Sequence, residues 1–167
     1  MERIRKVTLH DAPAVAAIYN HYILHTAATF ETAPVTAEAM QVRIRDIAAR
    51  YPYFVYENEA GELLGYCYIH TWKDKEAYRD TLETTFYVKP GHTGKGIGKK
   101  LMETLLAAVR DTPVHALIAC ISLPNDASIR LHARFGFEKA AHFREAGQKF
   151  GRRIDVEEWE WLKPDTE

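Results

Sequence analysis

A glycine-rich turn that joins an expected strand to an expected helix is the feature that most constrains this chain. Four glycines fall between Gly91 and Gly98, directly after the strand pattern of Leu82–Val88. The helix expected from Gly96 to Arg110 begins within this turn and has an apolar face. Backbone N–H groups and the positive end of the helix dipole then converge on one small volume, which favours a bound phosphate. Such a turn also serves packing alone, so both interpretations stay open at this point.

Two well-known phosphate-binding patterns do not fit the turn. A P-loop requires a lysine directly after its second glycine, and Ile97 follows Gly96 here. The dinucleotide fingerprint requires a third glycine at the position that Lys99 occupies. The sequence therefore predicts neither a P-loop nor a dinucleotide-binding motif.

The rest of the chain alternates between patterns typical of strands and of helices. In the second helix, which Thr36 caps, the expected buried positions are Ile44, Ile47 and Ala48. The fold class is therefore α+β, with both kinds of element mixed in a single domain over residues 1–167. The patterns predict strands at Arg3–Leu9, Tyr53–Tyr56, Leu63–Trp72, Leu82–Val88, Val114–Ile121, Phe137–Phe143 and Ile154–Trp161, and helices after Asp11, after Thr36, from Gly96 to Arg110 and from Asn125 to Arg134.

Charge and composition exclude some classes of function. Lysine and arginine number 22 against 23 aspartates and glutamates, a net charge of −1, which argues against general binding to nucleic acid or to anionic membranes. Cys67 and Cys120 each lie in an apolar run, which does not suggest a disulfide framework. His21 and His25 are spaced like metal ligands, but no third ligand accompanies them, so we expect no metal. Because the N-terminus lacks a signal-peptide pattern, we expect a soluble, cytoplasmic protein with no membrane partner.

A second motif follows the glycine turn, on the helix expected after Val114–Ile121. It resembles one of the two signatures of the GNAT acyl-CoA N-acetyltransferases, Asn-x-x-Ala/Ser-x-x-Leu-Tyr-x-x-x-Gly-Phe, with His132 at the tyrosine position. The glycine turn resembles the other, Gln/Arg-x-x-Gly-x-Gly/Ala, with Thr93 at its first position. The two segments read Asn125-Asp126-Ala127-Ser128-Ile129-Arg130-Leu131-His132-Ala133-Arg134-Phe135-Gly136-Phe137 and Thr93-Gly94-Lys95-Gly96-Ile97-Gly98.

Within this family the chain looks like the phosphinothricin and methionine sulfoximine/sulfone N-acetyltransferases, over about Ile4 to Leu162. Those enzymes also place histidine at the tyrosine position. The segments that carry the likeness are Ile18-Tyr19-Asn20-His21-Tyr22, Thr29-Phe30-Glu31, Leu123-Pro124-Asn125-Asp126 and Gly147-Gln148-Lys149-Phe150-Gly151.

The resemblance implies a fold, a cofactor and a set of contacts. The fold is the GNAT fold, a mixed, mostly antiparallel, twisted sheet flanked by helices, and acetyl-CoA lies in a split between Leu82–Val88 and Val114–Ile121. A homodimer is implied as well. The main chain of Phe86, Tyr87 and Val88 is expected to bind the pantetheine arm, and the other cofactor contacts are expected from Thr93, Gly94, Lys95, Gly96, Ile97, Gly98, Lys99, Asn125 and Ser128.

Two residues are candidates for the chemistry. An amine must lose its proton before it attacks a thioester, and Glu83, which resembles the family's carboxylate, is the candidate base. The alternative is that Glu83 simply faces solvent across the pleat of its strand. His132 shares a helix face with Ser128 and Asn125, and an imidazole there can donate a proton to sulfur or take one from the amine, a choice that the sequence leaves open.

The acceptor side is expected to combine cations with an aromatic wall. The candidate residues are Phe30, Trp72, Lys73, Tyr78, Arg79, Glu83, Thr84 and Thr85, with Lys73 where the family commonly has arginine. A solvated, charged loop is the alternative for Lys73 and Arg79. Cys120 is expected to pack in the core, the alternative being a covalent acyl-enzyme.

The sequence therefore predicts acetyl-CoA-dependent N-acetylation of a small amino-acid-like amine, by direct attack in a ternary complex. Two alternatives remain at this stage. One is a GNAT enzyme with another acceptor, such as a polyamine or a protein N-terminus, and the other is an acyl-CoA sensor without catalysis.

Overall fold

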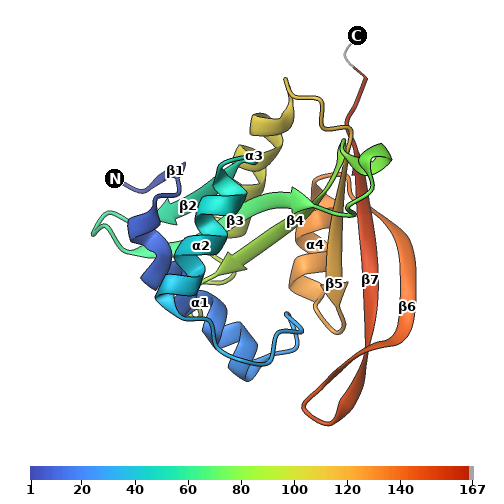
Figure 1. Ribbon diagram of the computed structural model, residues 1–167, viewed down its shortest axis with the longest axis horizontal. Helices are drawn as coiled ribbons and strands as arrows, with labels where there is room; N and C mark the ends of the chain where they lie inside the picture. The colour runs from blue at the N-terminus through green and yellow to red at the C-terminus, as the bar shows by residue number, and fades with distance from the viewer. Residues whose placement is uncertain (166–167) are drawn as a thin grey trace.

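The computed structural model describes residues 1–165 and contains one seven-stranded sheet (Figure 1). The strands lie in the order β1-β2-β3-β4-β5-β7-β6, and among the described residues only β4 and β5 pair in parallel. This is the mixed, mostly antiparallel sheet that the resemblance predicted. The strands are β1 (Arg3–Lys6), β2 (Tyr53–Glu57), β3 (Leu63–Thr71), β4 (Thr81–Val88), β5 (Ala116–Ser122), β6 (Glu138–Lys149) and β7 (Arg152–Leu162).

The sheet is split between β4 and β5. The two strands pair over only three positions, from Thr81–Ala116 to Glu83–Ile118, and then diverge. The last five residues of β4 and the last four of β5 therefore present strand edges to each other without a ladder between them. This is the split predicted from the family resemblance, and it opens a gap in the middle of the sheet.

Helices cover both faces of the sheet. α1 (Ala12–His25) and α2 (Ala37–Ala48) lie on one face, and α3 (Ile97–Val109) and α4 (Asp126–Arg134) lie on the other (Figure 1). Short 3-10 helices, η1 (Leu9–Asp11) and η2 (Glu76–Tyr78), precede α1 and β4. Strand alternation then directs Glu83, Thr85 and Tyr87 toward the α1–α2 side, and Thr84 and Phe86 toward the α3–α4 side.

Each helical layer has its own apolar core. On the α3 side, Leu101, Leu105 and Val109 are fully buried against the sheet. The helix approaches closely because Gly65 of β3 has no side chain: a Cβ there would lie 3.1 Å from Ile97 Cγ2. On the α1–α2 side, a second cluster gathers around Val15. Burial of these side chains, at about 2–3 kcal/mol for each large one, fixes both layers on the sheet.

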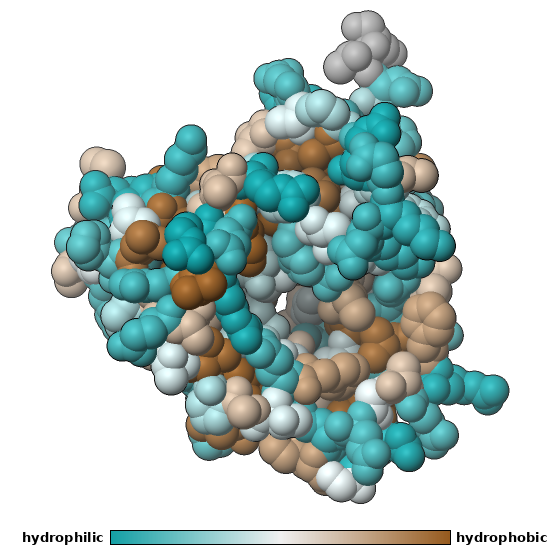
Figure 2. Space-filling model, viewed as in Figure 1, coloured by the Kyte–Doolittle hydropathy of each residue, from teal (hydrophilic) through white to brown (hydrophobic). Residues whose placement is uncertain are grey.

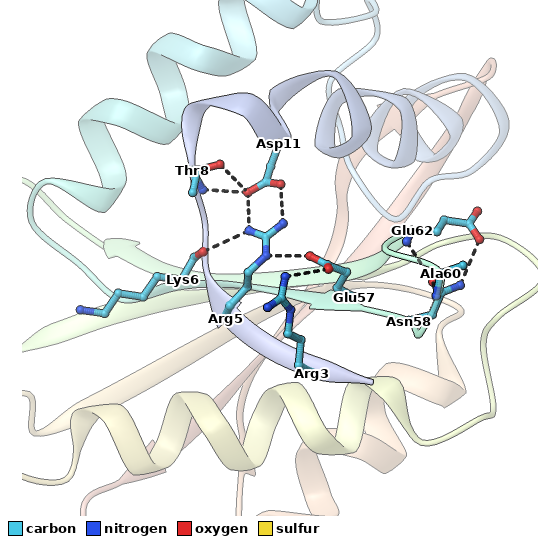
Figure 3. Close-up of polar contacts among 9 residues, drawn as sticks. All are labelled: Arg3, Arg5, Lys6, Thr8, Asp11, Glu57, Asn58, Ala60 and Glu62. Atoms are coloured by element: carbon cyan, nitrogen blue, oxygen red, sulfur yellow. Dashed lines mark hydrogen bonds and ion pairs between the residues drawn. The ribbon is translucent and has the colours of Figure 1, made fainter. Parts of the chain in front are cut away.

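An ion-pair network ties the N-terminal strand to the rest of the fold (Figure 3). The guanidinium of Arg5 donates two hydrogen bonds of 2.8 Å to Asp11 and one of 2.7 Å to Glu57. Arg3 contacts the same Glu57 carboxylate, and Asp11 also accepts the backbone N–H of Thr8. The network joins β1, η1 and β2 at the edge of the sheet.

The structure corrects some expected boundaries and burials. Leu9 lies in η1 rather than in β1, because Asp11 accepts bonds from Thr8 and turns the chain after Lys6. Ala48 is exposed, since it lies at the end of α2 beyond the sheet-facing stripe. The strands expected at Phe137–Phe143 and Ile154–Trp161 extend into one long hairpin that turns at Phe150 and Gly151. The register shifts between Phe143 and Gly147, which interrupts the regular alternation of side chains along β6. The sequence pattern therefore did not predict that the strand continues beyond Phe143.

Within residues 1–165, no helix is both long enough and apolar enough to cross a bilayer.

Candidate active site

A cavity of about 880 Å³ lies where β4 and β5 diverge, and Figure 2 shows the molecule hollowed between its α1–α2 half and its β6–β7 half. Both faces of the sheet contribute to its walls, because the split connects them. Glu83 reaches it from the α1–α2 side and His132 from the α3–α4 side. The fold therefore brings the two candidate catalytic residues into one cavity.

The glycine turn forms one end of this cavity. Gly94 and Gly96 have φ of +75° and +83°, which glycine adopts without strain, and a Cβ on either would meet nothing within 4 Å. Close packing therefore does not explain why glycine occupies these two positions. It does explain Gly98, because a Cβ there would lie 3.3 Å from Leu131 of α4. The predicted residues that line the cavity here are Thr93, Gly94, Gly96, Ile97, Gly98 and Lys99; Lys95 is exposed and lies outside the lining.

The backbone amides of this turn are available to a ligand. Within the described chain, none of the N–H groups from Thr93 to Lys99 donates a hydrogen bond to another group. Gly96 caps α3 without a side-chain partner, so the first amides of the helix stay open. These donors and the helix dipole suit a diphosphate.

The open edge of β4 forms a second wall. Thr84, Thr85, Phe86, Tyr87 and Val88, all predicted to bind the donor or the acceptor, line the cavity. The carbonyl of Val88 already accepts a hydrogen bond from the hydroxyl of Tyr22, so that oxygen is occupied. The remaining main-chain groups of this edge have no partner from β5, because the two strands have separated.

Glu83 sits at the last paired position of β4 and is half-buried, with 30% of its side chain exposed. Burial, and then the nearby carboxylate of Glu158, raises the pKa of Glu83 to about 7. The closest basic group is His70, whose Nε2 lies 3.8 Å from Glu83 Oε1. Burial lowers the pKa of His70, so its neutral ring does not stabilise the carboxylate. Glu83 therefore lines the cavity rather than facing open solvent, and it titrates near neutral pH.

His132 is buried, with 4% of its surface exposed, and its ring packs edge-on against Phe86 and Phe137. Its Nδ1 lies 2.7 Å from the carbonyl oxygen of Ser128, and a carbonyl only accepts, so Nδ1 carries the hydrogen. Burial lowers the pKa of His132, so the neutral ring has a lone pair on Nε2. Nε2 is the one buried side-chain nitrogen or oxygen within residues 1–165 that lacks a partner.

Asn125 and Ser128 line the cavity at the start of α4. The side-chain oxygen of Asn125 caps the helix by accepting the Ser128 N–H at 3.2 Å. Its side-chain amide nitrogen stays free to donate to a ligand. Asn125 therefore has a structural role, which the sequence motif did not reveal, alongside its expected role in binding.

Four of the predicted acceptor-binding residues lie outside the cavity lining. Trp72 and Tyr78 pack edge to face, and the ammonium of Lys73 lies 4.1 Å from the centre of the Trp72 ring. Arg79 is exposed beside Glu76 and Asp80. By contrast, Phe30 lines the cavity from the segment after α1.

Cys120 does not pack in the core, because its side chain points to the cavity side of β5. Burial, with the carboxylates of Glu83 and Glu158, raises the pKa of this thiol to about 11, so it is a weak nucleophile. His21 and His25 have ring centres 5.0 Å apart, and no group of three or more potential metal ligands occurs in the part of the chain that the structure describes.

The sequence did not identify part of the aromatic wall. Tyr19 and Tyr22 of α1, and Tyr68 and His70 of β3, line the cavity. Helical spacing indicated only a buried stripe for the tyrosines of α1. The two-residue spacing of Tyr68 and His70 on β3 does indicate that their side chains share one face of the sheet. In the structure this is the face of Glu83, because His70 pairs with Glu83 in the β3–β4 ladder.

Comparison with known proteins agrees with this geometry. The family model of the acetyltransferase (GNAT) domain matches residues 4–157. The chain is 39% identical to a phosphinothricin N-acetyltransferase of Streptomyces coelicolor, over 92% of each chain. It is 38% identical to an L-methionine sulfoximine/L-methionine sulfone acetyltransferase of Pseudomonas aeruginosa, over 92% of this chain and 90% of that one.

A solved structure extends the likeness to three dimensions. A GNAT superfamily phosphinothricin acetyltransferase from Sinorhizobium meliloti, in complex with acetyl-CoA, superimposes with a TM-score of 0.93 at 31% identity, over 97% of this chain and 89% of that one. The match covers the split sheet, the glycine turn and α4 together. The chain therefore belongs to the GNAT family of N-acetyltransferases, whose acetyl donor is acetyl-CoA.

Proposed function

We propose that this protein transfers the acetyl group of acetyl-CoA to the amino group of a small amino-acid-like acceptor, by direct attack while both are bound. This acceptor class includes phosphinothricin, methionine sulfoximine and methionine sulfone. The observation that carries the proposal is the meeting of Glu83, His132 and the open glycine turn in one cavity. The activities for which the relatives are named support the acceptor class.

The residues of the turn fit the donor. The unpaired amides between Thr93 and Lys99 would hold the diphosphate, and the positive end of α3 adds to the attraction. The open edge of β4 and the Asn125 side chain would bind the pantetheine arm and neighbouring groups. When bound, acetyl-CoA supplies an activated acetyl thioester.

Glu83 would act as the general base. An aliphatic ammonium has a pKa of ~10.4, so proton transfer to an ordinary glutamate, at ~4.3, costs about 8 kcal/mol. Transfer to a carboxylate whose pKa is about 7 costs about 5 kcal/mol. Burial of Glu83 therefore makes it a stronger base, while about half of it remains ionised at neutral pH.

His132 would act as an acceptor. Since Nδ1 donates to Ser128, the neutral ring offers only the lone pair of Nε2 to the cavity. It can orient or relay a proton that leaves the amine, but it has no hydrogen there to donate at neutral pH. The geometry thus favours one of the two roles that the sequence left open.

Direct attack is supported over a covalent acyl-enzyme. Cys120 is the thiol that lines the cavity, and its raised pKa keeps it protonated. The half-buried base next to it, Glu83, has a pKa about four units lower and so does not hold the thiol as a thiolate. An attacking amine therefore needs no enzyme-bound intermediate.

The acceptor would lie on the Glu83 side of the sheet, against Phe30, Tyr68 and Thr85. Contacts from Trp72, Lys73, Tyr78 and Arg79 stay predictions, as do a single domain over the whole chain, a homodimer and a cytoplasmic location.

The test is thiol release from acetyl-CoA with a panel of amines, with the acetylated product identified by mass. We expect turnover with methionine sulfone. A polyamine or a peptide N-terminus as the best acceptor would replace the proposed class. Binding of acetyl-CoA with no thiol release from any amine would instead indicate a sensor.

A further inference from the structure

A second carboxylate, Glu158 of β7, lies close to the cavity and to Glu83, although it is not part of the cavity lining. It lies directly opposite Cys120 in the β5–β7 ladder, and Cys120 lines the cavity. Val156, two residues earlier on the same face of β7, lines it as well. Glu158 is half-buried, and among the described residues it forms neither an ion pair nor a side-chain hydrogen bond.

The surrounding face of the sheet is acidic. The register places His70, Glu83, Ile118, Glu160 and Glu138 in one row across five strands. The adjacent row across β5, β7 and β6 contains Cys120, Glu158 and Ala141. Neither row contains a lysine or an arginine.

Three cations outside the cavity lining already have partners, and Arg130 and Arg134 line the cavity from α4, on the opposite side of the sheet from Glu83. Arg43 forms two hydrogen bonds with Glu31, and the ammonium of Lys149 donates to the carbonyl of Thr29. Lys73 lies over the rings of Trp72 and Tyr78. Within residues 1–165, Glu158 therefore lacks a cationic partner, and Glu83 has only the neutral ring of His70 within 4 Å.

We propose that Glu158 determines acceptor specificity, so that the preferred acceptor carries a second cationic group besides the amine that is acetylated. This inference rests on the proposed function and narrows its acceptor class. A cationic side chain would pair with Glu158 in a partly desolvated place, where the attraction is stronger than in water. An anionic side chain would add a third negative charge beside Glu83 and Glu158, so an acceptor such as phosphinothricin would be the poorest of the proposed class.

The test compares three acceptors that differ in side-chain charge: Nε-trimethyllysine, methionine sulfone and phosphinothricin. Trimethyllysine is chosen because its cationic group cannot itself be acetylated. We expect the wild-type kcat/KM to be highest for trimethyllysine and lowest for phosphinothricin. Glu158→Gln should lower the value for trimethyllysine about tenfold and change that for methionine sulfone less than about twofold. It should also improve turnover of phosphinothricin.

Glu138→Gln is the matched control, since it removes the same charge from the same face two strands away from Cys120. It should leave the order of the three acceptors unchanged. The pH–rate profile gives a second readout. Glu83 faces His70, Cys120 and Glu158, and the negative charge of Glu158 raises the pKa of Glu83. Glu158→Gln removes this charge, so the rise of the rate with pH should shift to lower pH.

The outcomes distinguish the role of Glu158 from the acetyltransferase activity itself. Equal losses for all three acceptors in Glu158→Gln, or a wild-type preference for phosphinothricin, would overturn the role of Glu158 while leaving the acetyltransferase intact. An absence of thiol release with every acceptor would overturn the proposed function and the inference with it.

Discussion

Glu83 and His132 belong to opposite faces of the sheet, and each has an environment that sets its protonation. Glu83 is shielded on the α1–α2 side, where burial and a neighbouring carboxylate favour its neutral form. His132 is enclosed by two phenylalanine rings on the other side, where burial favours its neutral form as well. Burial thus makes Glu83 a stronger base, about half of which is ionised near pH 7, and the neutral ring of His132 has a free lone pair on Nε2, so both residues can accept a proton there.

Replacement of the base tests its role directly. Glu83→Gln keeps the size of the side chain but removes its basicity, so kcat should fall by about 10²–10⁴. Affinity for acetyl-CoA, measured by calorimetry, should stay nearly unchanged, because the glycine turn lies elsewhere in the cavity. If the variant instead lost acetyl-CoA binding, Glu83 would have a structural role.

The pKa of Glu83 also predicts the shape of the pH–rate profile. The carboxylate must be ionised to accept a proton, so the rate should rise with pH and level off above about pH 7. His132, with its lowered pKa, is already neutral over this range and adds no second limb there. Initial rates measured from about pH 5.5 to about pH 9 check this, and a rate independent of pH between about 6 and 8 would contradict it.

At the scale of elements, the junction of the glycine turn with α3 should control donor binding. Gly96→Trp places a large side chain where the cavity lies open, so the Kd for acetyl-CoA should rise more than about tenfold in calorimetry.

Gly91→Trp is the matched control. Gly91 has a similar φ, +81°, and equally open surroundings, but it does not line the cavity. The backbone strain is therefore the same in both variants. Equal losses of affinity would mean that strain, rather than blocked binding, causes the effect.

The periodic elements were predictable from sequence because their patterns are local. The apolar stripe of α3, the alternation along β4 and the breaks at Pro90 and Gly91 follow from residues close in the chain. The paired motifs also located the turn and α4 correctly. These signals were sufficient to place Glu83 and His132 in elements that meet.

What the sequence did not reveal depends on pairing between distant segments. The length of the β6–β7 hairpin is set by register with a partner strand, and an irregularity after Phe143 hides its pattern. The exposure of Cys120 follows from the divergence of β4 and β5, whereas its apolar neighbours indicated a core position. The Trp72–Lys73–Tyr78 cluster likewise forms by contacts of its own, outside the cavity.

At the scale of the whole molecule, the Arg5 network should make stability depend on acid pH. Partial burial raises the pKa of Asp11, but bonds from Arg5 and Thr8 outweigh this and hold it below its ordinary value. The resulting stabilisation is present above the unfolded pKa, about 3.9, and is lost as pH falls through the lower pKa of the folded state.

Arg5→Met should therefore lower the free energy of unfolding by about 1–3 kcal/mol at neutral pH, with a smaller difference in strong acid. Urea unfolding of both proteins at several pH values measures this. Arg45→Met is the control, since within residues 1–165 Arg45 pairs only with the exposed, adjacent Asp46. A loss that stayed constant down to the lowest pH would show that Arg5 acts through packing and not through its charge.

The three-residue pairing of β4 with β5 leaves a gap in the sheet, and residues from both faces of the sheet line the cavity there. His132 and the glycine turn line the cavity from the α3–α4 side of the sheet, and Glu83 lines it from the α1–α2 side. On the proposed function, the long, phosphorylated donor and the short amine would approach from opposite sides of the sheet and meet in this gap. Binding of one substrate would then not require release of the other.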